Sequence, residues 1–172
     1  CLGRYLVASA DTLEMAIWAN KFTYVGGCFA PLFTLMILAK LCKIKIPRIL
    51  LIILTIYSTI VLGLVMTIGY NDLYYKEVTL VNGNGFNYLE KVYAPLHILY
   101  PIMMILYAII MIVFIVYGIR NKRSLSYREI IVISSLAFSV FALYLVEKII
   151  DLNIDLFSVS YFIGIVLLIK YY

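Results

Sequence analysis

The sequence predicts an all-α fold: a polytopic transmembrane helical bundle of five complete spans with a short extracellular β-hairpin loop. Hydrophobic residues make up 65% of the 172 residues, charged residues only 13%, and the mean hydropathy is +1.05. Soluble domains carry about 25% charged residues, and here the charges lie in clusters between long apolar runs. Most of the surface must therefore face lipid, which excludes soluble, disordered and fibrous proteins.

Five apolar segments approach the roughly 20 residues that a membrane-spanning helix needs. We expect the spans at about 12–41, 48–69, 92–119, 129–147 and 153–170. Asp11 is expected to cap the first helix, and Pro47 suits the start of the second because a proline there loses no hydrogen bond. Asp151 and Asp155 are expected to cap the last helix, where carboxylates favour the positive end of the helix dipole.

Lys and Arg residues in the short loops predict the orientation of the chain. Nine of them fall on one side, in the loops 40–48 and 120–128 and at Lys170. The five on the other side are Arg4, Lys21, Lys76, Lys91 and Lys148. Cations concentrate on the cytoplasmic side, so we expect residue 1 outside, the C-terminus in the cytoplasm, and the chain in the inner (plasma) membrane.

The loop at 70–91 is the only polar stretch of any length, and we expect it outside. Residues 74–81 are rich in Tyr, Val and Thr, the next four read Asn-Gly-Asn-Gly, and a second short run follows at 86–89. Asn and Gly tolerate the positive φ of tight hairpin turns. We therefore expect a β-hairpin over the outer mouth of the bundle.

No enzyme motif is present in the sequence. It lacks HExxH, GxSxG, P-loop, GxGxxG and paired intramembrane Asp patterns. The cysteines Cys1, Cys28 and Cys42 have no CxxC spacing, so neither a metal site nor a disulfide framework is indicated. We expect no catalytic residue, metal or cofactor in this segment, and the net charge of +5 reflects topology rather than nucleic-acid binding.

The candidate ligand-binding residues are those that bring ionisable and aromatic groups to the outer half of the bundle. They are Glu14, Lys21, Tyr24, Tyr93, His97 and Tyr100. Pro95 and Pro101 are expected to open the backbone hydrogen-bond ladder there.

Each candidate also has a structural interpretation. Glu14 and Lys21 are placed to pair along one helix face, and Lys21 would otherwise extend toward the membrane surface. His97 is either a hydrogen-bonded interfacial residue or a ligand-binding or pH-sensing group. Tyr93, Tyr100 and Tyr107 recur every seven residues, a spacing that helix packing also explains.

Several short motifs occur in a characteristic order: Ser9–Ala16, then Lys21–Gly26 with Pro31, the outer hairpin, Tyr93–Pro95, and residues 151–155 before a final apolar helix. In this order they resemble the N-terminal seven-transmembrane sensor region of bacterial histidine kinases, also found in front of diguanylate cyclase domains. The family often has Tyr-Gly-Pro where this chain has Tyr93-Ala94-Pro95, and a proline where it has Leu156.

The resemblance implies a single sensor-type domain over residues 1–172, truncated near the end of the family's second helix. The five spans would be helices three to seven of a sensory module that passes ligand binding in its outer half to a cytoplasmic kinase or cyclase domain. It further implies a homodimer in the full-length protein, and the ligand expected is a small or lipophilic molecule. The alternatives are a piece of a transporter or a small scaffold subunit, but no internal repeat or mid-membrane charge supports a transporter.

Overall fold

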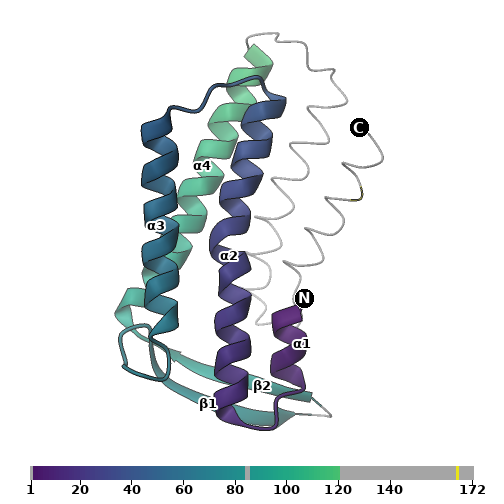
Figure 1. The fold of residues 1–172 in the computed structure, drawn as a ribbon, viewed down its shortest axis with the longest axis vertical. Helices are drawn as coiled ribbons and strands as arrows, with labels where there is room; N and C mark the ends of the chain where they lie inside the picture. The colour runs from purple at the N-terminus through teal and green to yellow at the C-terminus, as the bar shows by residue number, and fades with distance from the viewer. Residues whose placement is uncertain (1, 84–85, 121–165, 167–172) are drawn as a thin grey trace. The chain divides into compact units, whose positions relative to one another are not determined.

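A computed structural model describes residues 2–83, 86–120 and 166 of the chain (Figure 1). In chain order the elements are α1 (Leu2–Ala8), α2 (Leu13–Leu41), α3 (Arg48–Met66), β1 (Tyr75–Gly83), β2 (Phe86–Tyr93), the short 3-10 helix η1 (Pro95–Ile98) and α4 (Leu99–Arg120). The predicted spans at 129–147 and 153–170, and the predicted caps Asp151 and Asp155, lie outside the described residues except for Val166.

Three helical segments of the described chain are long and apolar enough to cross a membrane. They are Leu13–Lys40, Arg48–Met66 and Pro95–Arg120. The predominantly helical fold is therefore confirmed, although the third segment starts at Pro95 rather than at residue 92. Residues 92 and 93 still pair with β1, and Pro95 sets the start of the helix because its fixed φ suits a first turn.

The chain divides into two compact units. The first comprises Cys1–Phe33 and Pro47–Ile105, and the second comprises Thr34–Ile46 and Leu106–Tyr172. Helices α2 and α4 each continue from one unit into the other. In the second unit the end of α2 is closed by a turn in which Lys43 adopts φ 52° and the Ile44 N–H donates to the Ala39 carbonyl at 2.8 Å. All the candidate ligand-binding residues belong to the first unit.

The first turn of α2 is capped by a side chain, but not by the predicted one. The Met15 N–H donates to Thr12 Oγ1 at 3.3 Å, which makes Thr12 the N-cap. Asp11 was therefore the wrong prediction: it lies one residue too early for a helix that begins at Leu13. Pro47 does precede α3 directly, as predicted.

Helix α3 has one packed face and one face for lipid. Leu54, Ser58, Val61 and Val65 are buried at helical spacing. The opposite side exposes isoleucines at positions 49, 52, 53, 56 and 60. From the middle of α3, the Tyr57 hydroxyl donates to the Leu99 carbonyl at 3.0 Å and so joins α3 to the start of α4.

The predicted hairpin is confirmed, and its strands are longer than expected. β1 and β2 pair antiparallel from Tyr75 opposite Tyr93 to Gly83 opposite Phe86, with an irregularity after Tyr75. The strands lie across the end of α1 and the start of α2 (Figure 1). The Asn87 Nδ2 donates to the Ala10 carbonyl at 2.8 Å, which fixes the hairpin to the link between those two helices.

Candidate functional site

Aromatic side chains from α2, both hairpin strands, the residue before the hairpin, η1 and α4 meet at the open end of the hairpin, within the first unit. We name this group the Tyr–His cluster, and its members are Tyr24, Tyr74, Tyr75, Tyr93, His97 and Tyr100. Each of these rings lies within about 6 Å of another member, the range in which aromatic rings interact favourably. The cluster contains four of the predicted candidate residues and two that were not predicted.

The hairpin register is what brings these segments together. Tyr75 opens β1 and lies opposite Tyr93, which closes β2. The Ala94 N–H then donates to the Tyr74 carbonyl at 3.2 Å, extending the pairing by one step beyond the strands. The chain turns at Pro95 into η1, and this places His97 beside the same pair of tyrosines.

The rings within the cluster are held in specific geometries. Tyr93 stacks on His97 with centroids 4.0 Å apart and planes at 29°. Tyr24 of α2 meets Tyr74 and Tyr100 edge-on, at 5.7 and 5.1 Å. Its hydroxyl also lies 2.8 Å from that of Tyr75. Tyr24 therefore links α2 to both the hairpin and α4.

Burial disfavours the charged form of the two tyrosines at the start of the hairpin. Desolvation, the largest cause, raises the pKa of Tyr74 and that of Tyr75 well above the ordinary value for a phenol. The Tyr74 side chain is fully buried, and its hydroxyl has no hydrogen-bond partner in the part of the chain that the structure describes. Such an unpaired hydroxyl costs free energy that a bound acceptor would recover.

The Tyr–His cluster corrects two expectations about individual residues. Tyr93 is not on a helix with Tyr100 and Tyr107, because it belongs to β2. The two prolines do not interrupt a helix: Pro95 begins η1, and Pro101 lies in the first turn of α4, where its missing N–H breaks no intrahelical bond. Among the described helices, a proline lies well inside only α2, at Pro31.

Lys21 and Glu14 do not form the expected pair. Lys21 is only 2% exposed, and its Nζ lies over the rings of Trp18, at 4.6 Å, and Tyr70, at 4.7 Å. Glu14 is exposed in the first turn of α2. The hairpin end of α2 therefore buries the cation and leaves the carboxylate at the surface.

A second polar contact beside the cluster was also not predicted. The Lys91 Nζ donates to Asn20 Oδ1 at 2.9 Å and lies 5.6 Å from the centre of the Tyr75 ring. Asn20 is buried, and its Nδ2 has no partner among the described residues. Periodicity gave no signal for this contact, because it joins a helix to a strand 71 residues later.

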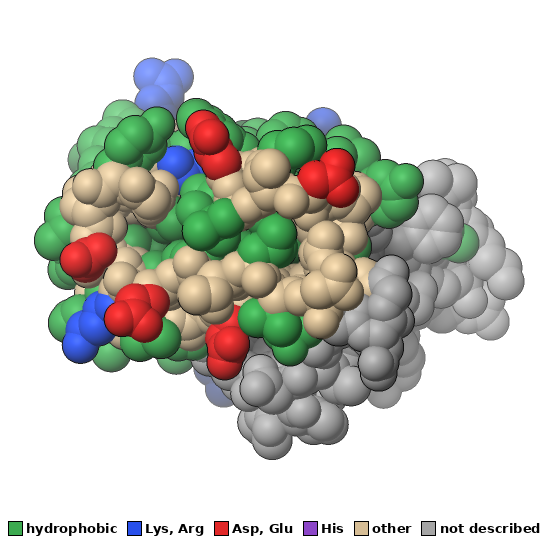
Figure 2. All heavy atoms as spheres, turned by 90° about the horizontal axis from the view of Figure 1, so that it is seen from below, with side chains coloured by type: hydrophobic (Ala, Val, Ile, Leu, Met, Phe, Trp, Pro, Cys, Tyr) green, Lys and Arg blue, Asp and Glu red, His purple; other side chains and the backbone are tan. Residues whose placement is uncertain are grey.

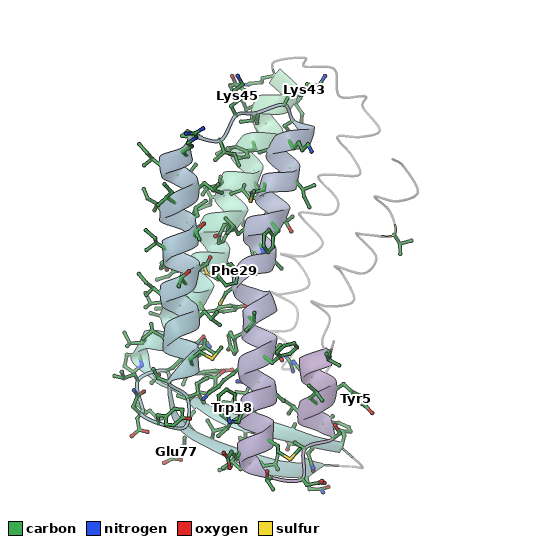
Figure 3. All side chains as sticks on the ribbon, viewed as in Figure 1. Tyr5, Trp18, Phe29, Lys43, Lys45 and Glu77 are labelled. Atoms are coloured by element: carbon green, nitrogen blue, oxygen red, sulfur yellow. The ribbon has the colours of Figure 1, made fainter. Side chains whose placement is uncertain are left out.

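Acidic side chains mark the surface at the hairpin end of the first unit. Figure 2 views this end and shows carboxylates spread over the described surface rather than gathered in one group. They are the exposed residues Asp11, Glu14, Asp72, Glu77 and Glu90, of which Glu77 points away from the helices (Figure 3). Within residues 2–83, 86–120 and 166, no three His, Cys, Asp or Glu side chains are grouped as metal ligands would be.

Comparison with known proteins identifies the family. The model of the N-terminal 7TM region of histidine kinase matches residues 1–171. No curated protein and no solved structure matches the chain. The family match and the three apolar helices indicate a membrane segment of the sensory, signal-transducing kind rather than a catalytic domain. The chain therefore belongs to the family of N-terminal seven-transmembrane regions of histidine kinases.

Proposed function

We propose that this segment is the sensory module of a bacterial signalling protein, in which a ligand bound at the hairpin end controls a cytoplasmic histidine kinase domain. A ligand that binds one arrangement of the helices more tightly than another shifts their equilibrium by that difference in affinity. The proposed module needs only a site that several helices share and a change in their arrangement on binding.

The observation that carries this proposal is the Tyr–His cluster. It joins α2, the hairpin, η1 and α4 through ring contacts and the 2.8 Å contact between the Tyr24 and Tyr75 hydroxyls. It also contains the buried hydroxyl of Tyr74, which has no hydrogen-bond partner among the residues that the structure describes. A ligand that accepts this hydrogen bond gains about 1 kcal/mol, which corresponds to roughly a fivefold shift in a two-state equilibrium.

The proposed orientation places the hairpin outside the cell. The described carboxylates all occur in α2's first turn, the residues just before it, and the segment between α3 and η1. The described cations on the other side of the spans are Lys40, Lys43, Lys45, Arg48 and Arg120. Short loops rich in Lys and Arg remain in the cytoplasm, so the Tyr–His cluster would face the exterior.

The test measures autophosphorylation of a full-length kinase that carries this segment, reconstituted in lipid nanodiscs without added ligand. Tyr24→Phe removes a hydroxyl that α2 contributes to the cluster, and His97→Ala removes the ring that stacks on Tyr93. We expect Tyr24→Phe to change the basal rate by about fivefold, because a lost hydrogen bond of about 1 kcal/mol shifts the helix equilibrium.

Tyr5→Phe is the matched control. Tyr5 lies on α1, is 69% exposed and points outward (Figure 3), so its hydroxyl should leave the rate unchanged. The hypothesis fails if Tyr24→Phe, His97→Ala, Lys21→Ala and Glu14→Gln all give the rate of the unmodified kinase. The sensing site would then lie elsewhere in the segment.

A further inference from the structure

The environment of Lys21 is unusual for a buried cation. The side chain is 2% exposed, two turns into α2, and its ammonium lies over the rings of Trp18 and Tyr70 at 4.6 and 4.7 Å. Among the described residues it has no carboxylate or carbonyl partner. Ring faces attract a cation, but they do not replace the anion that normally accompanies a buried charge.

The two side chains whose rings contact this ammonium, Trp18 and Tyr70, each carry a hydrogen-bond donor. The indole N–H of Trp18 can only donate, and the phenol O–H of Tyr70 can both donate and accept. The described carboxylates are all exposed and none is within ion-pair distance of Lys21. A set of donors around one positive charge is complementary to an oxyanion such as a carboxylate or phosphate.

The two aromatic side chains that contact the buried Lys21 are themselves exposed. Trp18 and Tyr70 are 53% and 77% exposed, and such residues are typical of the bilayer–water interface. Figure 3 shows Trp18 toward the hairpin end of α2. Large apolar side chains on α2 and in the loop before β1 are exposed as well: Met15, Phe22 and Leu73. These surroundings suit an apolar tail attached to the anion.

We infer that Lys21, Trp18 and Tyr70 bind the oxyanion head group of an amphiphile that reaches them from the bilayer. This inference deepens the proposed function, on which its signalling role rests, by naming the class of ligand. Tyr70 also lies four residues before Tyr74 of the Tyr–His cluster. It follows Gly69, whose φ of +83° shapes the turn, and the same segment ends at Tyr74.

The protein contains a built-in reporter for this site, because Trp18 is the single tryptophan of the chain. The experiment titrates the 172-residue chain, in nanodiscs of phosphatidylcholine, with dodecyl phosphate or dodecanoate while tryptophan fluorescence is recorded. An oxyanion that binds Lys21 changes the contact between the ammonium and the indole. We therefore expect a saturable change in fluorescence with both anionic amphiphiles.

Three variants assign the binding to the proposed groups. Lys21→Gln should weaken binding at least about tenfold, because a charge-assisted hydrogen bond is lost, whereas Lys21→Arg should retain it. Lys91→Gln is the matched control: Lys91 also lies over a tyrosine ring at the hairpin end, but Asn20 already accepts its hydrogen bond. Its affinity should equal that of the unmodified chain.

Dodecanol and inorganic phosphate separate the contributions of head group and tail. If dodecanol gives the same titration as dodecyl phosphate, or if folded Lys21→Gln titrates like the unmodified chain, the inference is overturned. It is also overturned if inorganic phosphate alone binds as tightly, because the ligand would then be a soluble anion.

Tyr70→Phe keeps the experiment decisive if Lys21→Gln does not fold. The exposed phenol is expendable for folding, and its loss should weaken binding by about fivefold; unchanged affinity would contradict the inference. Dodecyl phosphate could bind without changing kinase autophosphorylation. That result would support the head-group site but contradict the sensory role.

Discussion

The hairpin end of the first unit and the exposed side of α3 use polar side chains in opposite ways. At the hairpin end, polar groups bond across segments, as in the 2.8 Å contact of Tyr24 with Tyr75. In α3, the hydroxyls of Thr55 and Thr59 donate back to carbonyls of their own helix at 2.8 Å, and isoleucines cover the outside. Specific polar pairs therefore position the residues of the site, whereas apolar packing in lipid stabilises the membrane-spanning helices.

The largest expected effect comes from placing the same charge on an exposed position of each region. Ile56→Lys puts an ammonium on the lipid-facing side of α3, which should cost about 3 kcal/mol on insertion scales. Thr79→Lys puts it on the exposed hairpin directly opposite Glu90, where we expect no loss. Quantifying the folded, membrane-inserted fraction of both variants tests this difference. Equal losses would mean that α3 does not face lipid.

Two adjacent glycines of α2 distinguish a packed position from an open one. A Cβ at Gly27 would lie 2.7 Å from the Tyr100 hydroxyl, whereas a Cβ at Gly26 meets nothing within 4 Å. We expect Gly27→Ala to lower the free energy of unfolding by about 2 kcal/mol through overpacking. Gly26→Ala should raise it by about 0.5–1 kcal/mol, because alanine favours a helix. Thermal unfolding in nanodiscs provides the comparison, and effects of the same sign would rule out the close contact with Tyr100.

The neighbouring residues Tyr74 and Tyr75 of the cluster should respond differently to loss of the hydroxyl. Tyr75→Phe leaves the Tyr24 hydroxyl without its 2.8 Å partner, which should cost about 1–2 kcal/mol. Tyr74→Phe removes a hydroxyl that has no partner among the described residues, so stability should stay the same or rise. Unfolding free energies of the two variants measure the difference. A loss in Tyr74→Phe equal to that in Tyr75→Phe would reveal a bonded Tyr74.

The smallest effect is expected for a polar group inside the packed face of α3. The Ser58 hydroxyl donates to the Met103 sulfur at 3.6 Å, a weak interaction between a hydroxyl and a thioether. Ser58→Ala should therefore change stability by only about 0.6 kcal/mol, the average for side-chain hydrogen bonds between membrane helices. A loss as large as that of Tyr75→Phe would show that polar pairing matters equally in both regions.

Local signals explain what could be predicted from the sequence. Apolar length predicts the helices, and alternating Asn and Gly at 82–85 predicts the hairpin, because each signal lies within one short segment. Asp11 rather than the actual cap Thr12 was predicted because a one-residue shift in the start of a helix leaves its periodicity almost unchanged. Tyr93 was placed on a helix for a similar reason: its seven-residue spacing from Tyr100 does not reveal where the strand ends.

Contacts between distant segments explain what could not be predicted. Tyr24 and Tyr75 are 51 residues apart, and their contact depends on the register of the hairpin. Tyr70 reaches Lys21 only because the chain turns after α3 through Gly69 at φ +83°. Glycine adopts positive and negative φ about equally readily, so the sequence does not predict this turn. The partners of Lys21 therefore could not be identified from residue spacing.

The pairing at the base of the hairpin constrains how the first unit can move. The hairpin that connects α3 to α4 is closed at its base by the Tyr75–Tyr93 pair and by the Ala94 N–H on the Tyr74 carbonyl. The Tyr57 hydroxyl, in the middle of α3, also bonds to the Leu99 carbonyl at the start of α4. If one helix slid past the other by a turn, about 5.4 Å, these bonds would break together. These contacts therefore oppose sliding, and the low-cost motion for α3 and α4 is a tilt about the hairpin rather than a displacement along the bilayer normal.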